Sequence, residues 1–354
     1  MDKDKSIDIS KGLAMMLVVL GHALVPEIRE CSKVAENIYD FIYSFHMFFF
    51  FMISGYLFQN HYTKYRTNKK QFLNRKINQL IVPYAFITFV EYALLITITY
   101  LANFPNKEFT VGSFFMALVF NYNHFDTHLW FIYVLFYVFI INLLITKKKV
   151  LLCIFIAIMM FRNFMAIPIT LLLSIIKYCV PFLIGRIYYD YRKKILDYYT
   201  LKKTTVFIIL LIGILGLIGV NKIIDIMQTY EQCWWLSGII QEIQYIAGFI
   251  GTIMLLLLGD VLKQYKLKIL SVISKYNYEI YLLHQPFITA GISKVFYKIT
   301  GNWFVSVGSA FILGLGVSIF ISVIILKYSK PLSIMLLGKD IHCIKAVNNG
   351  SCRN

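Results

Sequence analysis

The sequence predicts an all-α integral membrane protein in which about ten transmembrane helices form one bundle, with both termini on the cytoplasmic side. Of its 354 residues, 59% are hydrophobic and only 15% are charged, and the mean hydropathy is +0.68. Soluble domains carry roughly 25% charged residues, whereas a run of roughly 18 apolar residues can cross a bilayer. Several runs here exceed that length, and the Lys and Arg residues fall between them. The solvent of this chain is therefore mostly lipid.

Apolar runs bounded by charged residues, Pro or Asn predict the individual spans. Each is expected to be helical because every backbone amide must be paired within its own segment where water is absent. The fifth run is short, and the ninth is unusually polar. We expect residues 1–330 to form the transmembrane domain and residues 331–354 to form a short cytoplasmic tail. The ten predicted spans are residues 9–26, 38–58, 80–101, 128–146, 150–161, 167–186, 204–221, 240–260, 270–290 and 303–326.

The basic residues predict how these spans are oriented. With the N-terminus inside, 27 of the 35 Lys and Arg residues fall on the cytoplasmic side, 7 fall on the opposite side, and Lys177 lies within a span. Such an excess is typical of cytoplasmic loops. The net charge of +17 is then explained by topology and by attraction to anionic membrane lipid, and no nucleic-acid partner is expected. The expected location is the cell (cytoplasmic) membrane.

Four of the seven histidines are predicted to lie at similar depth on four different spans. His22 is thirteen residues into the first span, roughly 20 Å from its cytoplasmic end at ~1.5 Å per residue. His46 and His128 begin the second and fourth spans at their outer ends, and His284 lies in the outer half of the ninth. Ionisable groups within membrane spans usually mark functional sites, so these residues predict a polar chamber that opens outward.

A histidine in such a chamber suits a general base, because imidazole accepts and returns a proton near neutral pH. For any one of the four, a structural hydrogen bond to a neighbouring helix is the alternative. No metal is expected, since no HxxxH or HxxE spacing occurs and the six cysteines are scattered without CxxC pairs.

Other charged residues extend this interpretation towards the cytoplasm. Arg75 and Lys76 precede the third span, and Lys11 lies three turns below His22 on nearly the same face of the first. These cations either fix topology or hold the phosphates of a cytoplasmic cofactor. Glu91 and Lys177 lie within spans, so each is expected to face the bundle interior or a water-filled cavity.

Taken together, these residues resemble the membrane acyltransferase-3 family, the O-acetyltransferases of bacterial surface polysaccharides. Five short motifs in order carry the resemblance, and they extend over nearly the whole chain. The motifs are Asp8-Ile9-Ser10-Lys11-Gly12 with Leu20-Gly21-His22, the run from Phe45-His46 to Ser54-Gly55-Tyr56, Arg75-Lys76 before Pro83-Tyr84, His128-Leu129-Trp130-Phe131, and Tyr281-Leu282-Leu283-His284-Gln285-Pro286.

The resemblance implies an acyltransferase that moves an acyl group, most often acetyl, from cytoplasmic acyl-CoA to a hydroxyl of a surface polysaccharide or its lipid-linked precursor. It implies that His22 is catalytic, either as general base or as acyl carrier. Acetyl-CoA or another acyl-CoA is the expected donor, with its phosphates near Lys11, Arg75 and Lys76. The residues expected to shape the outer chamber are His46, Glu91, His128, Trp130, Tyr281 and His284.

Two other functions are compatible with the same residues. A transporter or flippase for a lipid-linked sugar would use buried His, Glu and Lys as a proton or substrate path. Repeated halves typical of many transporters are not apparent in the sequence, which favours the enzyme. An N-acetyltransferase, or transfer of another acyl group such as succinyl, would leave the residue roles nearly unchanged.

Overall fold

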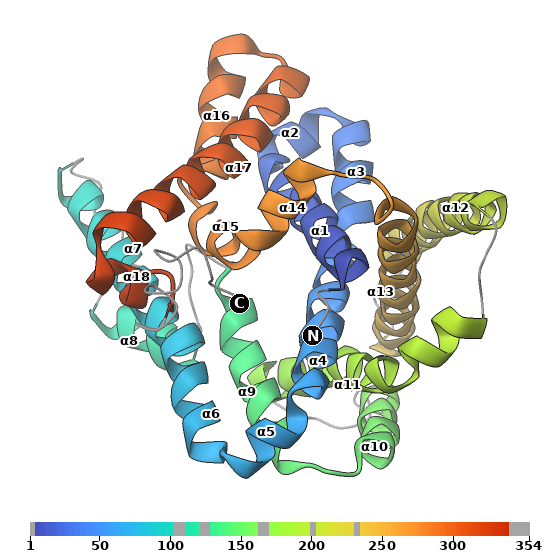
Figure 1. Cartoon of the computed structure of the whole chain (residues 1–354). Helices are drawn as coiled ribbons and strands as arrows, with labels where there is room; N and C mark the ends of the chain where they lie inside the picture. Colours follow the sequence, from blue (N-terminus) through green and yellow to red (C-terminus); the bar gives the residue numbers. More distant parts are fainter. Residues whose placement is uncertain are drawn as a thin grey trace.

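The computed structural model describes residues 4–101, 111–120, 128–161, 170–198, 203–229 and 234–339, and within them all regular structure is helical (Figure 1). Residues 167–169 of the sixth predicted span and residues 340–354 of the predicted tail lie outside this part of the chain. The helices are α1 (Lys5–Ala23), α2 (Pro26–Cys31), α3 (Lys33–Tyr43), α4 (His46–Asn60), α5 (Tyr62–Thr67), α6 (Lys69–Lys76), the π-helix η1 (Ile77–Ile81), α7 (Val82–Leu101), α8 (Val111–Phe120), α9 (Trp130–Leu144), α10 (Lys148–Phe161), α11 (Thr170–Tyr198), α12 (Lys203–Gln228), α13 (Trp234–Leu262), α14 (Lys268–Lys275), α15 (Asn277–Leu283), α16 (Thr289–Thr300), α17 (Trp303–Tyr328) and α18 (Lys330–Met335).

Seven helical segments of the described residues are long and apolar enough to cross a membrane, which makes the chain a multi-pass membrane protein. The helices α9 and α10 occupy the fourth and fifth predicted spans, but with 15 and 14 residues they are shorter than the roughly 18 residues that cross a bilayer. The total of ten spans and the side on which the termini lie stay predictions. The seven segments are Lys5–Ala23, Lys33–Asn60, Lys69–Leu94, Leu171–Arg192, Thr204–Gln228, Gly238–Leu262 and Trp303–Tyr328.

The predicted ninth span, residues 270–290, is wrong as a single helix. The chain there forms α14, then α15, and then a turn through His284 that leads into α16. Polar residues interrupt this segment, and other groups inside the protein form hydrogen bonds or ion pairs with them. The Asn277 side chain donates to the Lys11 carbonyl at 2.9 Å, and Glu279 pairs with Lys339 at 2.7 Å. Non-helical backbone at membrane depth is tolerated where it is buried in protein in this way.

The central element is α1, which packs against α3, α4, α13, α14, α15, α16 and α17 (Figure 1). Small residues allow this close packing. The Ser10 hydroxyl donates to the Leu255 carbonyl of α13 at 2.9 Å, and a Cβ atom on Gly12 would lie only 2.7 Å from the Leu270 carbonyl oxygen of α14. His22 therefore lies near the C-terminal end of a helix that other helices surround.

Two glycines bring α4 and α11 into direct backbone contact. A Cβ on Gly55 would overlap the Phe182 carbonyl, and one on Gly185 would overlap the Met52 carbonyl. This is the small-residue helix contact that the Ser54-Gly55 pair of the second predicted span suggests. One turn after Gly55, Gln59 accepts a hydrogen bond at 3.0 Å from the buried guanidinium of Arg186.

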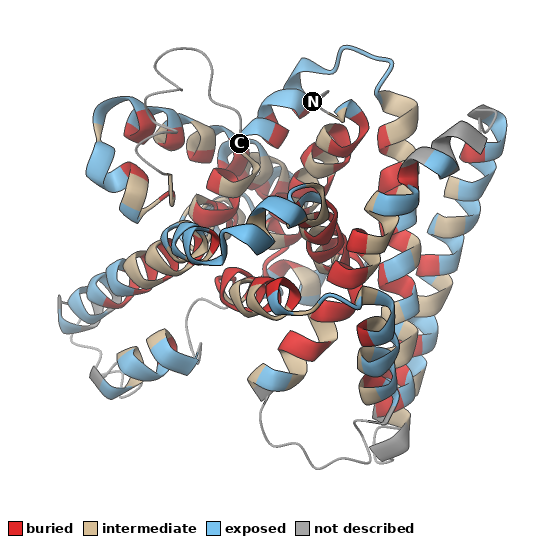
Figure 2. Cartoon of the chain, turned by 60° about the horizontal axis from the view of Figure 1, so that its bottom comes forward, coloured by how far each residue is buried: buried red, intermediate tan, exposed pale blue. Residues whose placement is uncertain are grey.

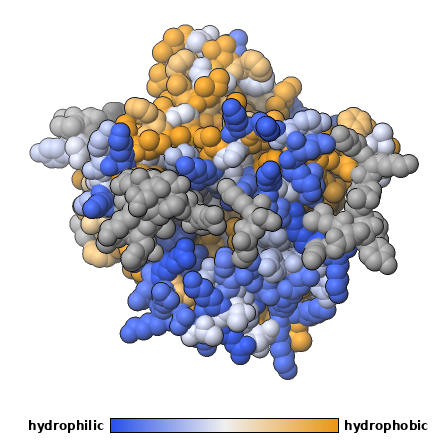
Figure 3. Space-filling model, in the orientation of Figure 1, coloured by the Kyte–Doolittle hydropathy of each residue, from blue (hydrophilic) through white to orange (hydrophobic). Residues whose placement is uncertain are grey.

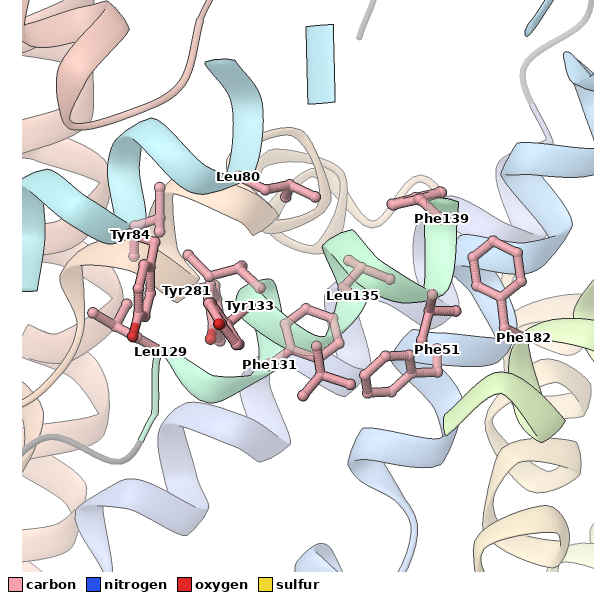
Figure 4. Packing of buried hydrophobic residues seen from close by; sticks show 14 of the residues in the cluster. Phe51, Leu80, Tyr84, Leu129, Phe131, Tyr133, Leu135, Phe139, Phe182 and Tyr281 are labelled. Atoms are coloured by element: carbon pink, nitrogen blue, oxygen red, sulfur yellow. The ribbon is translucent and has the colours of Figure 1, made fainter. Parts of the chain in front are cut away.

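An aromatic core surrounds α9. It extends from Tyr84 and Tyr281 near the start of α9, past Phe51 beside Phe131, to Phe182 beside Phe139 (Figure 4). Buried residues concentrate on the inner helices, whereas only 11% of the residues in the most apolar stretch of α12 are buried (Figure 2). Exposed apolar side chains on such outer helices are what a lipid solvent requires.

The surface divides into hydrophilic and hydrophobic regions. In the orientation of Figure 1, hydrophilic residues gather over α5 and α6 at the bottom, and hydrophobic ones dominate around α16 and α17 at the top (Figure 3). At the α16 end, an exposed ion pair of 2.8 Å joins Glu27 of α2 to Lys294 of α16. The hydrogen bond from Lys294 holds the pKa of the Glu27 carboxyl below its usual value.

Candidate functional site

The four predicted histidines meet in one place, which we call the histidine cluster (His22, His46, His128 and His284, with Tyr43). The ring of His284 lies 5.1 Å from that of His22 and 5.6 Å from that of His128, measured between centroids. Tyr43 links the fourth member, because its hydroxyl lies 3.2 Å from His22 Nδ1 and its ring lies 4.7 Å from that of His46. His22 is half-buried, and the other three histidines are buried.

Backbone carbonyls hold the outer members of the cluster in place. His46 begins α4 just after the chain breaks between α3 and α4, and its Nδ1 lies 2.9 Å from the Ile42 carbonyl that this break exposes. His284 follows α15, and its Nδ1 lies 2.9 Å from the Ile280 carbonyl. The Tyr281 hydroxyl donates to the His128 carbonyl at 2.5 Å. These bonds satisfy groups left over at helix ends and fix the ring positions.

A stack of planar groups positions Tyr43. Its ring lies 3.9 Å from that of Tyr39, one turn earlier on α3, and the planes differ by 24°. The guanidinium of Arg29 lies over the Tyr39 ring, 3.9 Å from its centroid. This stack holds the Tyr43 hydroxyl at His22.

A cavity of about 250 Å³ adjoins the cluster between α3, α4, α11, α12 and α13. Tyr43 forms part of its wall, and so does Tyr178, whose ring lies 5.1 Å from that of Trp130. Lys177 also lines it, so the prediction that this lysine faces a cavity is confirmed. The full lining is Asp40, Tyr43, Ser44, Met47, Phe48, Lys177, Tyr178, Asn221, Ile224, Asp225, Gln228, Gln244, Tyr245 and Gly248. Two lining residues contact predicted chamber residues: Tyr43 packs against His46, and Tyr178 packs against Trp130.

With this geometry in view, comparisons with known proteins identify the chain. A family model described as an acyltransferase domain matches residues 4–327. The chain belongs to the acyltransferase-3 family. Neither the curated proteins nor the solved structures gave a match. The protein is therefore a multi-pass membrane acyltransferase, and the family favours this activity over the transporter alternative.

In an acyltransferase, the pair of His22 and Tyr43 can supply a base. When Nδ1 carries the proton, it donates to the Tyr43 oxygen, and the basic lone pair of the imidazole is then on Nε2. Nε2 can then remove a proton from a hydroxyl or attack a thioester itself. The ring of His284, which follows α15, lies beside that of His22, and the ring of His128, which precedes α9, lies beside that of His284.

The predicted donor cations of this acyltransferase have different surroundings. Arg75, at the end of α6, is exposed. Lys76 is half-buried, donates to Gln79 at 3.0 Å and lies 4.0 Å above the Phe139 ring. Lys11 lies 3.6 Å from the Asp8 carboxylate, with its side chain 23% exposed.

Two consecutive residues at the start of α15 join these cationic segments. Asn277 donates to the carbonyl of Lys11 on α1, and Tyr278 donates to the carbonyl of Gln79 on η1. The π-helix η1 follows Lys76 directly, and short π-helical segments frequently occur at functional sites. The first-helix and third-helix motifs of the acyltransferase are therefore neighbours in space.

The remaining predicted chamber residues lie around the cluster. Trp130 begins α9 and packs near Phe51 and Tyr178, so it lies behind the cavity wall. Tyr281 supports His128, as described above. Glu91, which directly precedes Tyr92 on α7, is only 3% exposed, so the prediction that it faces the bundle interior is confirmed. Its place in the chamber stays a prediction.

Sequence reasoning did not find Tyr43 or the acidic cavity residues Asp40 and Asp225. A signal for Tyr43 exists, because Tyr39, Tyr43 and His46 are spaced by four and three residues and so share a helix face. The prediction of no metal site is not tested, although among the described residues no group of three or more His, Cys, Asp or Glu is arranged to hold an ion.

Proposed function

We propose that this acyltransferase transfers an acetyl group from cytoplasmic acetyl-CoA to a hydroxyl group of an extracytoplasmic surface polysaccharide or its lipid-linked precursor, in the cell membrane. The observation that carries the proposal is the pairing of His22 with Tyr43 within the histidine cluster, at one end of a helix that carries Lys11 near its other end. Eleven residues of helix separate Lys11 from His22 by about 16 Å at ~1.5 Å per residue.

The donor is held from the cytoplasmic side. Arg75 and Lys11 contact its phosphates, which form charge-assisted hydrogen bonds with such cations. Lys76, placed on the Phe139 ring, supports the same segment from inside the protein. The thioester then extends along α1 towards His22. Residues 1–330 form this acyltransferase domain, and residues 331–354 its cytoplasmic tail.

The chemistry takes place at His22 Nε2. This atom removes the proton from the acceptor hydroxyl as the oxygen attacks the thioester carbonyl carbon. The carbon–sulfur bond breaks, the thiolate leaves with the proton from His22, and the products are the O-acetyl ester and free CoA. If His22 instead carries the acyl group, Nε2 attacks the carbonyl first and the CoA thiolate leaves. The acceptor hydroxyl then attacks the acyl-imidazole, its proton balances that taken up by the thiolate, and Nε2 is regenerated. His46, Glu91, His128, Trp130, Tyr281 and His284 shape the chamber around these steps.

Mass spectrometry of the surface glycan tests this function. Cells with the intact gene should carry one acetyl group more per acceptor unit than cells without it. His22→Ala should abolish the difference while the folded protein remains in the membrane. His61→Ala is the matched control, since His61 is exposed at the end of α4. Full acetylation in the His22 variant would refute the catalytic role.

Single-turnover kinetics separates the two chemical routes. An acyl-histidine intermediate predicts release of CoA before acceptor is added, in an amount equal to the enzyme. The general-base route predicts CoA release only with the acceptor present. Digestion of the acetyl-CoA-treated protein would place any trapped acetyl group on the peptide that contains His22.

A further inference from the structure

The cavity beside Tyr43 has the chemistry of a site for a hydroxyl-rich ligand. Its polar lining combines carboxylates from Asp40 and Asp225 with the amides of Asn221, Gln228 and Gln244. A sugar hydroxyl both donates and accepts hydrogen bonds, and amides do both while carboxylates accept two or more. Side chains of this kind can therefore pair every hydroxyl of a sugar ring.

The aromatic part of the lining offers flat apolar surface. Tyr43, Tyr178 and Tyr245 all face the cavity. Each is held in place: Tyr178 stacks on Phe51 at 4.3 Å with planes 16° apart, and the Tyr245 hydroxyl donates to the backbone carbonyl of Lys177. Rigid tyrosines supply contact area at low entropic cost and suit the C–H faces of a sugar.

The charge of the cavity distinguishes acceptor from donor. Two carboxylates, Asp40 and Asp225, face one ammonium group, Lys177. The several phosphates of an acyl-CoA would be repelled by this balance, and the predicted donor cations lie on other elements, α1 and α6. The cavity is also small. Its volume of about 250 Å³ lies below the ~300–1,000 Å³ of sites for drug-sized ligands, so a single sugar unit suits it better than CoA.

The position of the cavity would let a ligand enter from one side and react at the other, near His22. Asp225 and Gln228, in the last turns of α12, and Gln244, in the N-terminal half of α13, are exposed. The charge distribution predicts that this end faces outward. Tyr43, also part of the lining, contacts His22 at 3.2 Å.

We infer that this cavity binds one sugar unit of the acceptor glycan, with the reacting hydroxyl directed past Tyr43 towards His22. The inference rests on the proposed function for the identity of the ligand. Acceptor selectivity then resides in α3, α11, α12 and α13, and Asp225 and Gln244 contact the acceptor without taking part in donor binding.

Equilibrium binding tests the inference. The full chain is placed in lipid nanodiscs, and the probe is a fluorescently labelled single repeating unit prepared from the de-acetylated surface polysaccharide of cells that carry the gene. Binding is measured without acyl-CoA. Asp225→Asn and Gln244→Leu should each weaken binding about tenfold, the effect of one hydrogen bond to a charged or well-placed polar group. Gln241→Leu is the matched control on the same helix, since Gln241 is not part of the lining, and it should bind normally.

A transfer assay with acetyl-CoA separates this inference from the proposed function. Both lining variants should raise the KM for the repeating unit about tenfold and leave the KM for acetyl-CoA unchanged. Unchanged binding and KM in both variants, or no binding by the wild-type protein, would overturn the assignment of the cavity. Binding that responds to the variants, with no acetyl transfer to the bound sugar, would instead refute the proposed reaction and leave the cavity as a sugar site.

Discussion

Tyr43→Phe isolates the hydrogen bond that orients His22. The substitution removes one oxygen atom, which lies 3.2 Å from His22 Nδ1, and keeps the ring stacked on Tyr39 at 3.9 Å and beside His46 at 4.7 Å. A hydrogen bond of this type contributes about 0.5–1.5 kcal/mol, which corresponds to a rate decrease of roughly 2- to 13-fold. His22→Ala should cost far more, roughly 10²–10⁴-fold, because it removes the base itself.

The assay is the rate of CoA release from acetyl-CoA in the presence of the acceptor, with purified protein in nanodiscs. The decrease in Tyr43→Phe should appear in kcat and leave the KM for acetyl-CoA unchanged, since Tyr43 does not contact the predicted donor cations. Tyr43→Leu should be slower still, because it also removes the ring from the stack. A Tyr43→Phe rate equal to wild type would refute the orienting role. A rate as low as that of His22→Ala would equally refute it, by making the phenol indispensable to the chemistry.

Three further predictions concern other parts of the protein. Arg75→Ala should raise the KM for acetyl-CoA about tenfold, measured against Arg66→Ala, an exposed arginine of α5 that should have no effect. Gly55→Ala should destabilise the protein by about 1–3 kcal/mol in thermal unfolding because α11 occupies the space of the new methyl group, whereas Gly216→Ala, with nothing nearby, should be neutral or stabilising. Glu27→Gln should lower the free energy of unfolding by at most about 1 kcal/mol at neutral pH, and the difference should vanish in acid. Because the pKa of the Glu27 carboxyl is lowered in the folded protein, its pairing with Lys294 stabilises the fold above the usual carboxyl pKa. This stabilisation is lost as the pH falls through the lowered pKa.

Much of the candidate site could be predicted from the sequence, because the position of a residue along a transmembrane helix sets its depth in the membrane. His22, His46 and His128 each lie near the end of an apolar run, so their height in the membrane could be counted in residues. Packing the runs side by side then brings His22 and His128 together at His284, while His46 joins them through Tyr43. Tyr43 escaped this reasoning because tyrosine is common near membrane surfaces, and its hydroxyl acquires a role only through the contact with another helix.

The broken helix at residues 270–290 could not be predicted by the same route. Hydropathy averages over about 18–19 residues, and α14 and α15 together keep the average of one apolar span. What decides between one helix and two is whether a partner exists for each freed polar group. Here Asn277 and Glu279 find theirs on α1 and at Lys339, far away in sequence.

The short helix α15 also has a mechanical consequence. Its first residues, Asn277 and Tyr278, hold the two segments that carry the predicted donor cations, and His284, at its other end, lies against His22. Seven helical residues span only about 10 Å, so α15 acts as a rigid strut between them. The donor-side segments and the histidine cluster are therefore joined through this one short helix as well as through α1.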